Sequence, residues 1–390
     1  MHGLLSSMLP PLSLYIHFPW CVRKCPYCDF NSHAMPDGHW LPEAGYVDAL
    51  LRDLQHEVPF AQNRTLCSIF FGGGTPSLMS GVAVARILDA AEKYIGFADN
   101  IEITLEANPG TVERQHFHDY RKAGVNRLSL GAQSFDDAQL QKLGRIHRAD
   151  ETRHAVDALR AAGFDNFNLD LMFALPEQTT NAALADLQQA LALHPTHLSW
   201  YQLTIEPNTV FFSTPPAALP DDDMQFEIYQ TGKQWLQQTG YEQYETSAYS
   251  QPGRQCIHNR NYWEFGDYLG IGAGAHGKVT QIEKGKLQVR RRQKTRLPAH
   301  YLKSVNPCSQ DTVLTPEDLP VEFMLNALRL MEGVPRELFA ARTGLPLAGI
   351  TQTVNQLIQD GLLKADTKQL VPTPRGALFL NDVVSRFMRQ

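Results

Sequence analysis

The sequence has 390 residues but no apolar run approaching the roughly 20 that an α-helix needs to span a bilayer. Between Met1 and Pro11 there is no basic segment followed by a long apolar core, so no signal peptide is expected. There is no excess of positive charge either, because the net charge is −6, which disfavours nucleic acid and anionic lipid as partners. These absences predict a globular protein of the cytoplasm.

Cysteine is scarce and unevenly spread. The chain has six cysteines, and three of them, Cys21, Cys25 and Cys28, fall within one short stretch. The others, Cys67, Cys256 and Cys308, are scattered along the chain. A secreted protein stapled by disulfides would distribute its cysteines differently, whereas a cluster in a chain without a signal peptide indicates metal or redox chemistry in a reducing compartment.

Short β-branched or aromatic runs alternate with longer amphipathic stretches from Ser13 to about Leu203. The predicted strands are Leu14–Phe18, Cys67–Phe71, Ile101–Leu105, Arg127–Leu130, Phe167–Met172 and Leu198–Gln202. The helices predicted between them are Tyr46–Glu57, Val82–Tyr94, Val112–Lys122, Thr152–Ala162 and Ala182–Leu193. This alternation indicates parallel βαβ units. Six such units predict an α/β fold built on an incomplete (β/α)6 barrel rather than on a full eight-fold barrel.

The pattern changes twice after the barrel, so we predict three domains: the barrel in residues 1–210, an extension in 211–312, and a C-terminal domain in 313–390. Helical patterns at Leu319–Met331, Pro335–Thr343 and Leu347–Gly361 precede a strand, turn and strand through Leu363–Val371. This order resembles a winged-helix-like α+β domain. Its expected recognition stretch, Leu347–Asp360, has no Lys or Arg. Because phosphate contacts require cations, we expect a structural or lid domain rather than DNA binding.

Polar residues and glycines stand where the predicted strands end. They are the cysteine triplet after the first strand, Gly72-Gly73-Gly74-Thr75-Pro76 after the second, Glu106 and Asn108 after the third, Gln133 and Ser134 after the fourth, and Tyr201 and Gln202 after the sixth. Asp170 lies within the fifth strand. Because barrel proteins build their sites from the carboxyl ends of their strands, we expect these side chains to converge on one rim.

The spacing Cys21-x-x-x-Cys25-x-x-Cys28 suits a loop that wraps three thiolates around one corner of a [4Fe–4S] cluster. A fully protein-ligated cluster uses four cysteines, so three leave one iron open to chelate S-adenosylmethionine, whose radical chemistry the protein then directs. The alternative is a structural zinc site made of the three cysteines with His17 or His33. Zinc motifs usually come as two short pairs, and the sequence has no second pair.

Two stretches carry a family resemblance: Tyr15-Ile16-His17-Phe18-Pro19-Trp20-Cys21 and Pro26-Tyr27-Cys28-Asp29-Phe30. They resemble the radical SAM superfamily and, within it, the branch of the oxygen-independent coproporphyrinogen III oxidases and the HemW-type heme chaperones. The resemblance runs from Leu14 to the C-terminus. It implies a set of S-adenosylmethionine contacts in this chain. They are Tyr15, Tyr27, Gly73, Gly74, Thr75, Glu106, Gln133, Arg145 and Asp170.

A second motif, His258-Asn259-Arg260-Asn261-Tyr262-Trp263, lies in the predicted extension. Histidine is a common axial ligand of heme iron, and aromatic side chains pack on porphyrin faces, although a lone histidine among aromatics is more often structural. The resemblance links this motif to heme binding in the chaperones. It implies His258, Tyr262 and Trp263 as heme-binding residues, with Cys256 and His276 as further candidates. For the basic run Arg290–Arg296 we expect a solvated loop rather than contacts to heme propionates.

The resemblance also separates two activities. The oxidases carry a further cysteine two residues after the triplet, where this chain has Phe30. We therefore expect a heme chaperone that passes heme to an acceptor such as a respiratory cytochrome, and we assign no catalytic residue. Its expected partners are heme, that acceptor and an electron donor for the cluster, with any membrane association made through a partner. We expect a monomer or weak dimer.

Two other functions remain open at this point. One is oxygen-independent decarboxylation of coproporphyrinogen III by a radical SAM mechanism. The other is a zinc-stabilised regulatory protein that binds nucleic acid through its tail.

Overall fold

The computed structural model describes residues 9–35 and 41–388. The expectation about a signal peptide in Met1–Pro11 falls almost entirely outside the described residues. None of the described helices is both long and apolar enough to cross a membrane.

A twelve-stranded mixed sheet forms the centre of the molecule, in the order β14-β13-β12-β11-β1-β4-β5-β6-β7-β8-β10-β9. Six of its strands are parallel neighbours: β1 (Leu12–Phe18), β4 (Leu66–Gly73), β5 (Phe97–Ala107), β6 (Arg127–Gln133), β7 (Phe167–Phe173) and β8 (His197–Gln202). No pairing between described residues joins β9 to β14, so the barrel is open. The predicted α/β fold with six βα units is confirmed.

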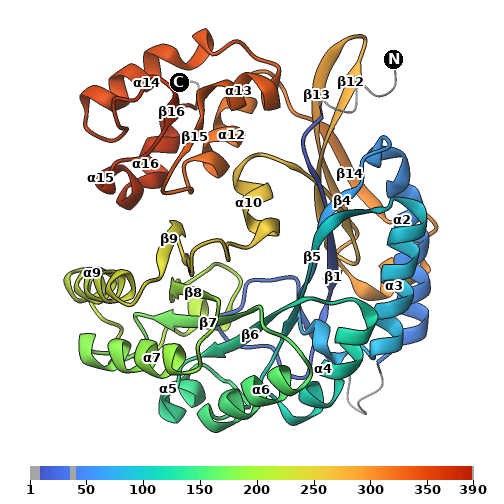
Figure 1. Ribbon diagram of the computed structural model, residues 1–390, viewed down its shortest axis with the longest axis vertical. Helices are drawn as coiled ribbons and strands as arrows, with labels where there is room; N and C mark the ends of the chain where they lie inside the picture. Colours follow the sequence, from blue (N-terminus) through green and yellow to red (C-terminus); the bar gives the residue numbers. More distant parts are fainter. Residues whose placement is uncertain (1–8, 36–40, 389–390) are drawn as a thin grey trace.

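Helices follow these strands, and the longer ones cover the outer face of the sheet (Figure 1). They are α2 (Glu43–Ala61), α3 (Gly81–Tyr94), α4 (Thr111–Ala123), α5 (Asp137–Lys142), α6 (Ala149–Ala161), α7 (Thr180–Ala192), α8 (Val210–Ser213) and α9 (Asp222–Gln238). A 3₁₀ turn, η1 (Pro76–Leu78), precedes α3. Each sequence-predicted helix and strand of the barrel matches one of these elements, with the ends moved by a few residues.

The strand period decides which side chains enter the barrel. In β1 the residues Leu12, Leu14, Ile16 and Phe18 are almost fully buried in the main hydrophobic core. The alternate positions of the strand hold polar side chains, among them Tyr15 and His17. Since successive strand residues point to opposite faces, one face of β1 packs against the helices while the other lines a polar interior.

The chain then extends the sheet on both sides. The extension comprises β9 (Glu242–Glu245), β10 (Ala248–Ser250), α10 (Ile257–Trp263), β11 (Asp267–Ile271), β12 (His276–Glu283), β13 (Lys286–Lys294), α11 (Pro298–Lys303) and β14 (Cys308–Val313). Strand β11 pairs in parallel with β1, and β12 to β14 follow as antiparallel neighbours. Figure 1 shows α10 on the concave side of the sheet.

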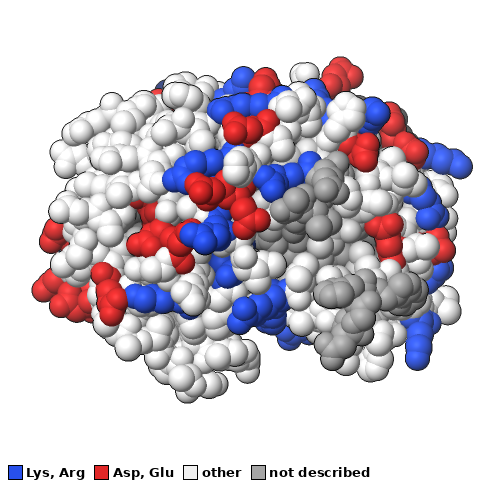
Figure 2. All heavy atoms as spheres, turned by 90° about the horizontal axis from the view of Figure 1, so that it is seen from below, with Lys and Arg blue, Asp and Glu red and all other residues white. Residues whose placement is uncertain are grey.

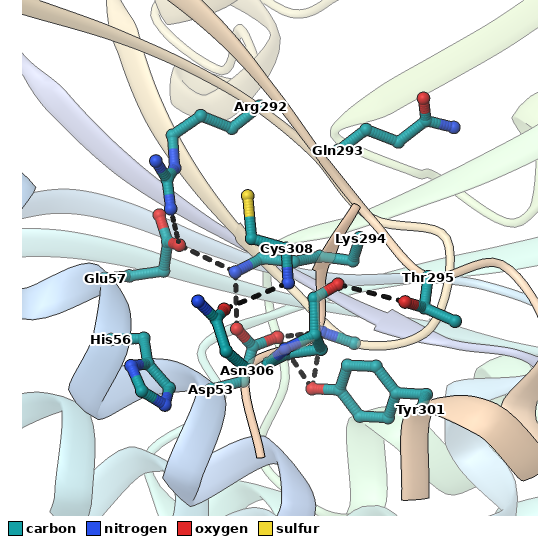
Figure 3. A network of polar contacts seen from close by, with 12 residues as sticks. Asp53, His56, Glu57, Arg292, Gln293, Lys294, Thr295, Tyr301, Asn306 and Cys308 are labelled. Atoms are coloured by element: carbon teal, nitrogen blue, oxygen red, sulfur yellow. Dashed lines mark hydrogen bonds and ion pairs between the residues drawn. The ribbon is translucent and has the colours of Figure 1, made fainter. Parts of the chain in front are cut away.

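The solvated loop expected at Arg290–Arg296 is wrong, because most of this run belongs to strand β13. Two of its cations are buried against helix α2. Lys294 Nζ lies 2.5 Å from Asp53 Oδ1 and 2.6 Å from Glu57 Oε1, and Arg292 Nη2 lies 2.9 Å from Glu57 Oε1. Figure 3 shows these side chains pointing toward one another. The carboxylates of α2 supply the charge that allows this strand to be buried.

The C-terminal residues form a second hydrophobic cluster. Their elements are α12 (Leu319–Ala327), β15 (Val334–Pro335), α13 (Arg336–Thr343), α14 (Ala348–Gln359), β16 (Gln369–Leu370), α15 (Pro374–Leu378) and α16 (Leu380–Ser385). Strands β15 and β16 pair, and an isolated bridge joins Leu363 to Pro372. This arrangement is the α+β C-terminal domain that the sequence predicts. It packs beside α10, on the side of the sheet opposite α2 and α3 (Figure 1).

Candidate functional site

A cavity of about 500 Å³ lies at the carboxyl ends of the parallel strands. All three clustered cysteines line it, and so do the predicted S-adenosylmethionine contacts except Tyr15. Most of the residues expected at the rim therefore converge there, whereas Gly72, Ser134 and Gln202 do not line the cavity. Tyr15 is half-buried in β1, where its hydroxyl lies 3.0 Å from His17 Nδ1.

The cysteines stand on a loop that begins with β2 (Trp20–Cys21) and ends with β3 (His33–Ala34), two short strands that pair in parallel. Within it the Cys28 amide donates to the Cys25 carbonyl over 3.2 Å. Asn31 ties the loop to the rest of the protein, because its Nδ2 donates to the carbonyls of Ala273 and Arg296. These contacts fix the loop against the turn between β11 and β12 and against the segment that follows β13.

The surroundings of the cysteine thiols disfavour the thiolate form unless a cation is bound beside it. Burial raises the pKa of the Cys21 and Cys28 thiols, so thiolate formation there needs a bound metal. In the described ranges, no three His, Cys, Asp or Glu side chains converge closely enough to hold one ion. A zinc site needs all its ligands about 2 Å from one point, whereas a cluster presents a separate iron to each thiolate. The donor set fits an iron–sulfur cluster.

His17, one of the two histidines considered as a zinc ligand, is already engaged. Its Nε2 lies 2.9 Å from the Asn31 carbonyl, and its Nδ1 lies 3.0 Å from the Tyr15 hydroxyl. Burial lowers the pKa of His17 to about 4, so the ring is neutral at neutral pH. It supports the cysteine loop.

The glycine-rich loop after β4 is bonded to the segment that leads into the cysteines. The Gly74 amide donates to Phe18 O over 2.6 Å, and the Thr75 amide donates to Trp20 O over 2.8 Å. A Cβ at Gly74 would stand 2.5 Å from Trp20 O, which no side chain tolerates. Gly73 has φ +111°, a conformation that favours glycine. The glycines therefore allow the loop to close over this wall of the cavity.

Two partly buried carboxyl groups face the cavity, Glu106 at the end of β5 and Asp170 in β7. Burial and, to a smaller extent, the nearby Asp170 together raise the pKa of Glu106 to about 8. Glu106 accepts a hydrogen bond from the Gly73 amide over 3.2 Å. An acid pair with raised pKa values suits a ligand that brings positive charge. S-adenosylmethionine carries a sulfonium and an ammonium group, so the cavity fits it.

Arg145 links the strand ends to the cysteines. Its Nη2 donates to Asn108 Oδ1 over 2.6 Å and to Gly131 O over 2.9 Å. Its Nη1 lies 3.6 Å from Cys25 Sγ. Its Nε is buried and has no partner among the described residues. The guanidinium thus connects the strand ends to the cysteine loop, and its Nε–H is available to donate to a ligand.

Asn108 is a site residue that the family resemblance did not single out. It accepts from Arg145, and its Nδ2 donates to Thr75 Oγ1 over 3.1 Å. Its position in the sequence, two residues after Glu106 at the end of a predicted strand, indicates that Asn108 belongs to the site.

Gln133 is held in an unusual backbone conformation with φ +66°. Asp186 of α7 fixes the residues that follow it, because it accepts from the Ser134 hydroxyl over 2.8 Å and from the Phe135 amide over 2.7 Å. The Gln133 side chain accepts from the Tyr201 hydroxyl over 2.7 Å. Strain of this kind persists only when neighbours enforce it, and it is typical of functional sites.

The predicted heme residue His258 lies outside the lining of the cavity, buried on α10. Its Nδ1 lies 2.8 Å from Ser68 Oγ, and its Nε2 lies 2.9 Å from the Tyr262 hydroxyl. In this arrangement neither ring nitrogen is free to ligate iron. Burial lowers the pKa of His258 to about 3, so the ring stays neutral and joins α10 to β4.

The other heme candidates lie in three different surroundings. Cys256 is fully buried, and its thiol donates to Glu102 Oε1 over 3.3 Å. His276 is exposed at the start of β12. Trp263 is half-buried, and the Arg329 guanidinium lies 4.3 Å from the centre of one of its rings. The structure does not bring these residues together around one point, and Asn259 is the motif member that lines the cavity.

An open six-strand α/β barrel with three cysteines at its mouth defines a radical SAM protein, and residues 15–190 match the Radical SAM superfamily. Residues 314–379 match the HemN C-terminal domain. The chain belongs to the HemW heme chaperone family, because it is 50% identical to heme chaperone HemW of Escherichia coli (strain K12) over 98% of this chain and 99% of that protein. The predicted resemblance is confirmed.

Other proteins are also similar to this chain over nearly its whole length. Heme chaperone HemW of Haemophilus influenzae is also 50% identical, over 98% of this chain and 99% of its own length. The mouse radical S-adenosyl methionine domain-containing protein 1, mitochondrial, is 34% identical over 97% of this chain and 87% of its own. Among solved structures, coproporphyrinogen III oxidase (HemN) from Escherichia coli superposes with a TM-score of 0.80 at 23% identity, covering 99% of this chain and 92% of that one. This last likeness concerns the fold.

Proposed function

We propose that the chain holds a [4Fe–4S] cluster on Cys21, Cys25 and Cys28, binds S-adenosylmethionine in the adjoining cavity, and carries heme to an acceptor such as a respiratory cytochrome. The observation that carries the proposal is the cavity, in which three thiols face an acid pair across a glycine-rich loop. Membership of the heme chaperone family supports heme as the molecule that the protein carries.

The chain's own residues divide the binding of S-adenosylmethionine among them. The acid pair Glu106 and Asp170 can ionise beside a cationic ligand, because a nearby positive charge favours the charged form of a carboxyl. Arg145 offers a donor to a carboxylate. Gly73, Gly74 and Thr75 allow close approach of the backbone, and Tyr27 and Gln133 line the remaining wall. Tyr15 supports the site indirectly, through His17. When bound, the open iron of the cluster supplies one-electron reduction of the sulfonium.

Glu106→Gln tests the acid pair. The ordinary pKa of the carboxyl is 4.5 and its folded pKa is about 8, so the folded apoprotein binds more protons than the unfolded chain between these values. Stability of the apoprotein therefore falls as pH rises through this window. The variant should lose that slope and gain about 3 kcal/mol at pH 7 in the free energy of unfolding, while it binds S-adenosylmethionine more weakly.

Urea unfolding at several pH values and equilibrium binding measure the two effects. The exposed Glu92 of α3 provides the control, because Glu92→Gln should keep the wild-type pH profile and affinity. An unchanged profile in Glu106→Gln would show that the carboxyl is not buried as described.

The position of the heme-binding residues belongs to the same proposal. Ligation by His258 would break its hydrogen bonds to Ser68 and Tyr262, at a cost of about 1 kcal/mol each. His276 needs no such change, because its ring is already exposed. We therefore propose His276 as the more accessible iron ligand. Tyr262 and Trp263 of α10 stay proposed heme contacts, and Cys256 stays engaged with Glu102.

Phe30 separates this proposal from coproporphyrinogen oxidation. It lines the cavity and is 61% exposed, in the position where the oxidases carry a further cysteine. An apolar, exposed side chain there offers no thiol to the reaction and suits contact with an apolar ligand or partner.

Anaerobic turnover decides between the two activities. We expect cluster-loaded protein, supplied with reductant, S-adenosylmethionine and coproporphyrinogen III, to form no protoporphyrinogen beyond one equivalent. Chromatography of the oxidised porphyrins measures this directly. Multiple turnovers would overturn the carrier function and establish an oxidase.

The remaining partners follow from the same proposal. It places the protein in the cytoplasm as a monomer or weak dimer, with an electron donor for the cluster and no nucleic acid. On the face shown in Figure 2, basic and acidic side chains are interspersed rather than gathered into a field of one sign. Arg148 and Asp137 form one of the exposed ion pairs of the surface.

A further inference from the structure

The cavity has a second end, away from the cysteines, where the C-terminal domain meets the sheet. Its lining there includes Glu245 and Ser247 beside β9, Asn259 of α10, and Arg329, which follows α12. An antiparallel bridge between Glu245 and Leu330 holds the two parts of the chain together at this point. None of these residues belongs to the cysteine and acid-pair end described above.

Arg329 is only partly satisfied at this end. Its Nη2 donates to Glu245 Oε2 over 3.1 Å, and its guanidinium stacks 4.3 Å from the centre of a Trp263 ring. Its Nε is buried and has no acceptor among the described residues. A buried guanidinium N–H without an acceptor is costly to leave in that state, so it marks a place where an acceptor is missing.

A second buried donor in the same group of side chains is also without a partner. The indole Nε1 of Trp263 has no hydrogen-bond partner in the part of the chain that the structure describes. Asn259 stands four residues before Trp263 on α10, and residues four apart share a helix face. His258 and Tyr262, also four apart, take the other face and bond to each other. The motif therefore has one face on which His258 and Tyr262 bond to each other and another that carries the unpaired indole N–H of Trp263.

The donors at this end are those that bind a carboxylate. A guanidinium pairs with a carboxylate through charge-assisted hydrogen bonds, and indole and amide N–H groups add further donors. We propose that Arg329, Trp263 and Asn259 form a carboxylate subsite that takes a propionate side chain of heme, an inference that rests on the proposed heme-carrier function. The carboxylate of S-adenosylmethionine is accounted for at the opposite, cysteine end. Glu245 holds Arg329 in place until the propionate arrives.

Comparison of hemin with its dimethyl ester tests the subsite, because the ester keeps the macrocycle and iron but lacks the carboxylates. Full-length, cluster-loaded protein is titrated with each compound and followed in the Soret band. We expect wild type to bind hemin about tenfold more tightly than the ester, the difference that one charge-assisted contact provides. Arg329→Gln should bind both compounds alike, at the affinity of wild type for the ester.

Two further variants control for the loss of an arginine in general and for the unpaired carboxylate that Arg329→Gln would leave. Arg260→Gln is the matched control, since Arg260 lies on α10 and pairs with Glu264 and Glu332 outside the cavity; it should retain the tenfold preference. Glu245→Gln combined with Arg329→Gln removes the carboxylate that the single variant would leave buried without its partner. The double variant should fold with wild-type S-adenosylmethionine affinity and still show no preference.

The outcomes separate this inference from the function on which it rests. Saturable binding of neither compound to wild type would remove the heme-carrier function itself. Tight binding of both compounds with equal affinity to wild type would leave the carrier function standing and overturn the subsite. A preference that survives in Arg329→Gln, or an equal loss for both compounds, would also overturn it, because only a carboxylate contact discriminates acid from ester.

Discussion

Cys25→Ala is expected to lose the iron–sulfur cluster and, with it, tight binding of S-adenosylmethionine. Two thiolates cannot replace the three that line the cavity, and the open iron that would chelate the ligand disappears with the cluster. Of the three cysteines, we choose Cys25 for this test because it contacts a residue of the proposed S-adenosylmethionine site: Arg145 Nη1 lies 3.6 Å from its sulfur. The measurement is anaerobic reconstitution with iron and sulfide, followed by visible absorption and iron content per chain.

Another cysteine of the chain serves as the control for the loss of the cluster. Cys308 also has a free thiol, on β14 and away from the cavity lining. Cys308→Ala should take up iron and sulfide as wild type does and bind S-adenosylmethionine with unchanged affinity. Wild-type iron content in Cys25→Ala would contradict the cluster assignment, and one tightly bound zinc per chain in wild type under the same conditions would favour the structural zinc alternative.

Lys294→Met should destabilise the fold by about 3–5 kcal/mol, the cost of breaking a buried ion pair while leaving its partners charged. The ammonium lies between Asp53 and Glu57, all three side chains being almost completely buried. Figure 3 shows Lys294 beside both carboxylates. Arg292 pairs with Glu57 and with Asp311 but not with Asp53, so removal of Lys294 leaves Asp53 without a cation among the described residues.

The effect should reach the cysteine loop, because Asp53 also anchors the turn that holds it. Asp53 Oδ2 accepts from the Gly272 amide over 3.1 Å and from the Tyr301 hydroxyl over 2.7 Å. The next residue, Ala273, accepts from Asn31 of the cysteine loop. A weakened turn loosens that loop, so the variant should also incorporate less iron than wild type at temperatures where it remains folded.

Urea unfolding of the apoprotein measures the loss of stability, with Lys286→Met as the control. Lys286 begins the same strand, β13, but is exposed, so its replacement should change the free energy of unfolding by no more than about 0.5 kcal/mol. A loss below about 1 kcal/mol in Lys294→Met would contradict the view that this ion pair is buried and uncompensated once broken.

The barrel was predictable because its strands and helices carry clear periods. Runs such as Leu14–Phe18 and the amphipathic helices between them follow the alternation of a parallel βαβ fold. The same reasoning located the rim, since Glu106 and Gln133 end their strands. Its physical basis is general: parallel strands deliver their last side chains to one edge of the sheet.

The extension was not predictable in the same way. Arg290–Arg296 suggested a solvated loop because a run of cations ordinarily stays in water. The carboxylates that permit its burial, Asp53 and Glu57, come from α2, far away in the sequence. Only the folded structure shows that the two segments meet.

The heme motif shows the same limit at the level of single residues. The sequence reveals a histidine among aromatic residues but not that Ser68 and Tyr262 occupy both of its ring nitrogens. Likewise, nothing in the sequence brings Arg329 of the C-terminal domain to the end of the barrel cavity. Such contacts depend on how separate elements pack, which local periodicity does not encode.

Titration of the cluster-loaded wild-type protein with hemin, followed by mixing with an apocytochrome, tests the central claim most directly. The account predicts saturable binding of one heme per chain and a Soret band that then shifts to that of the holocytochrome. Absence of saturable binding, or heme that stays with the protein while the apocytochrome remains empty, would contradict it.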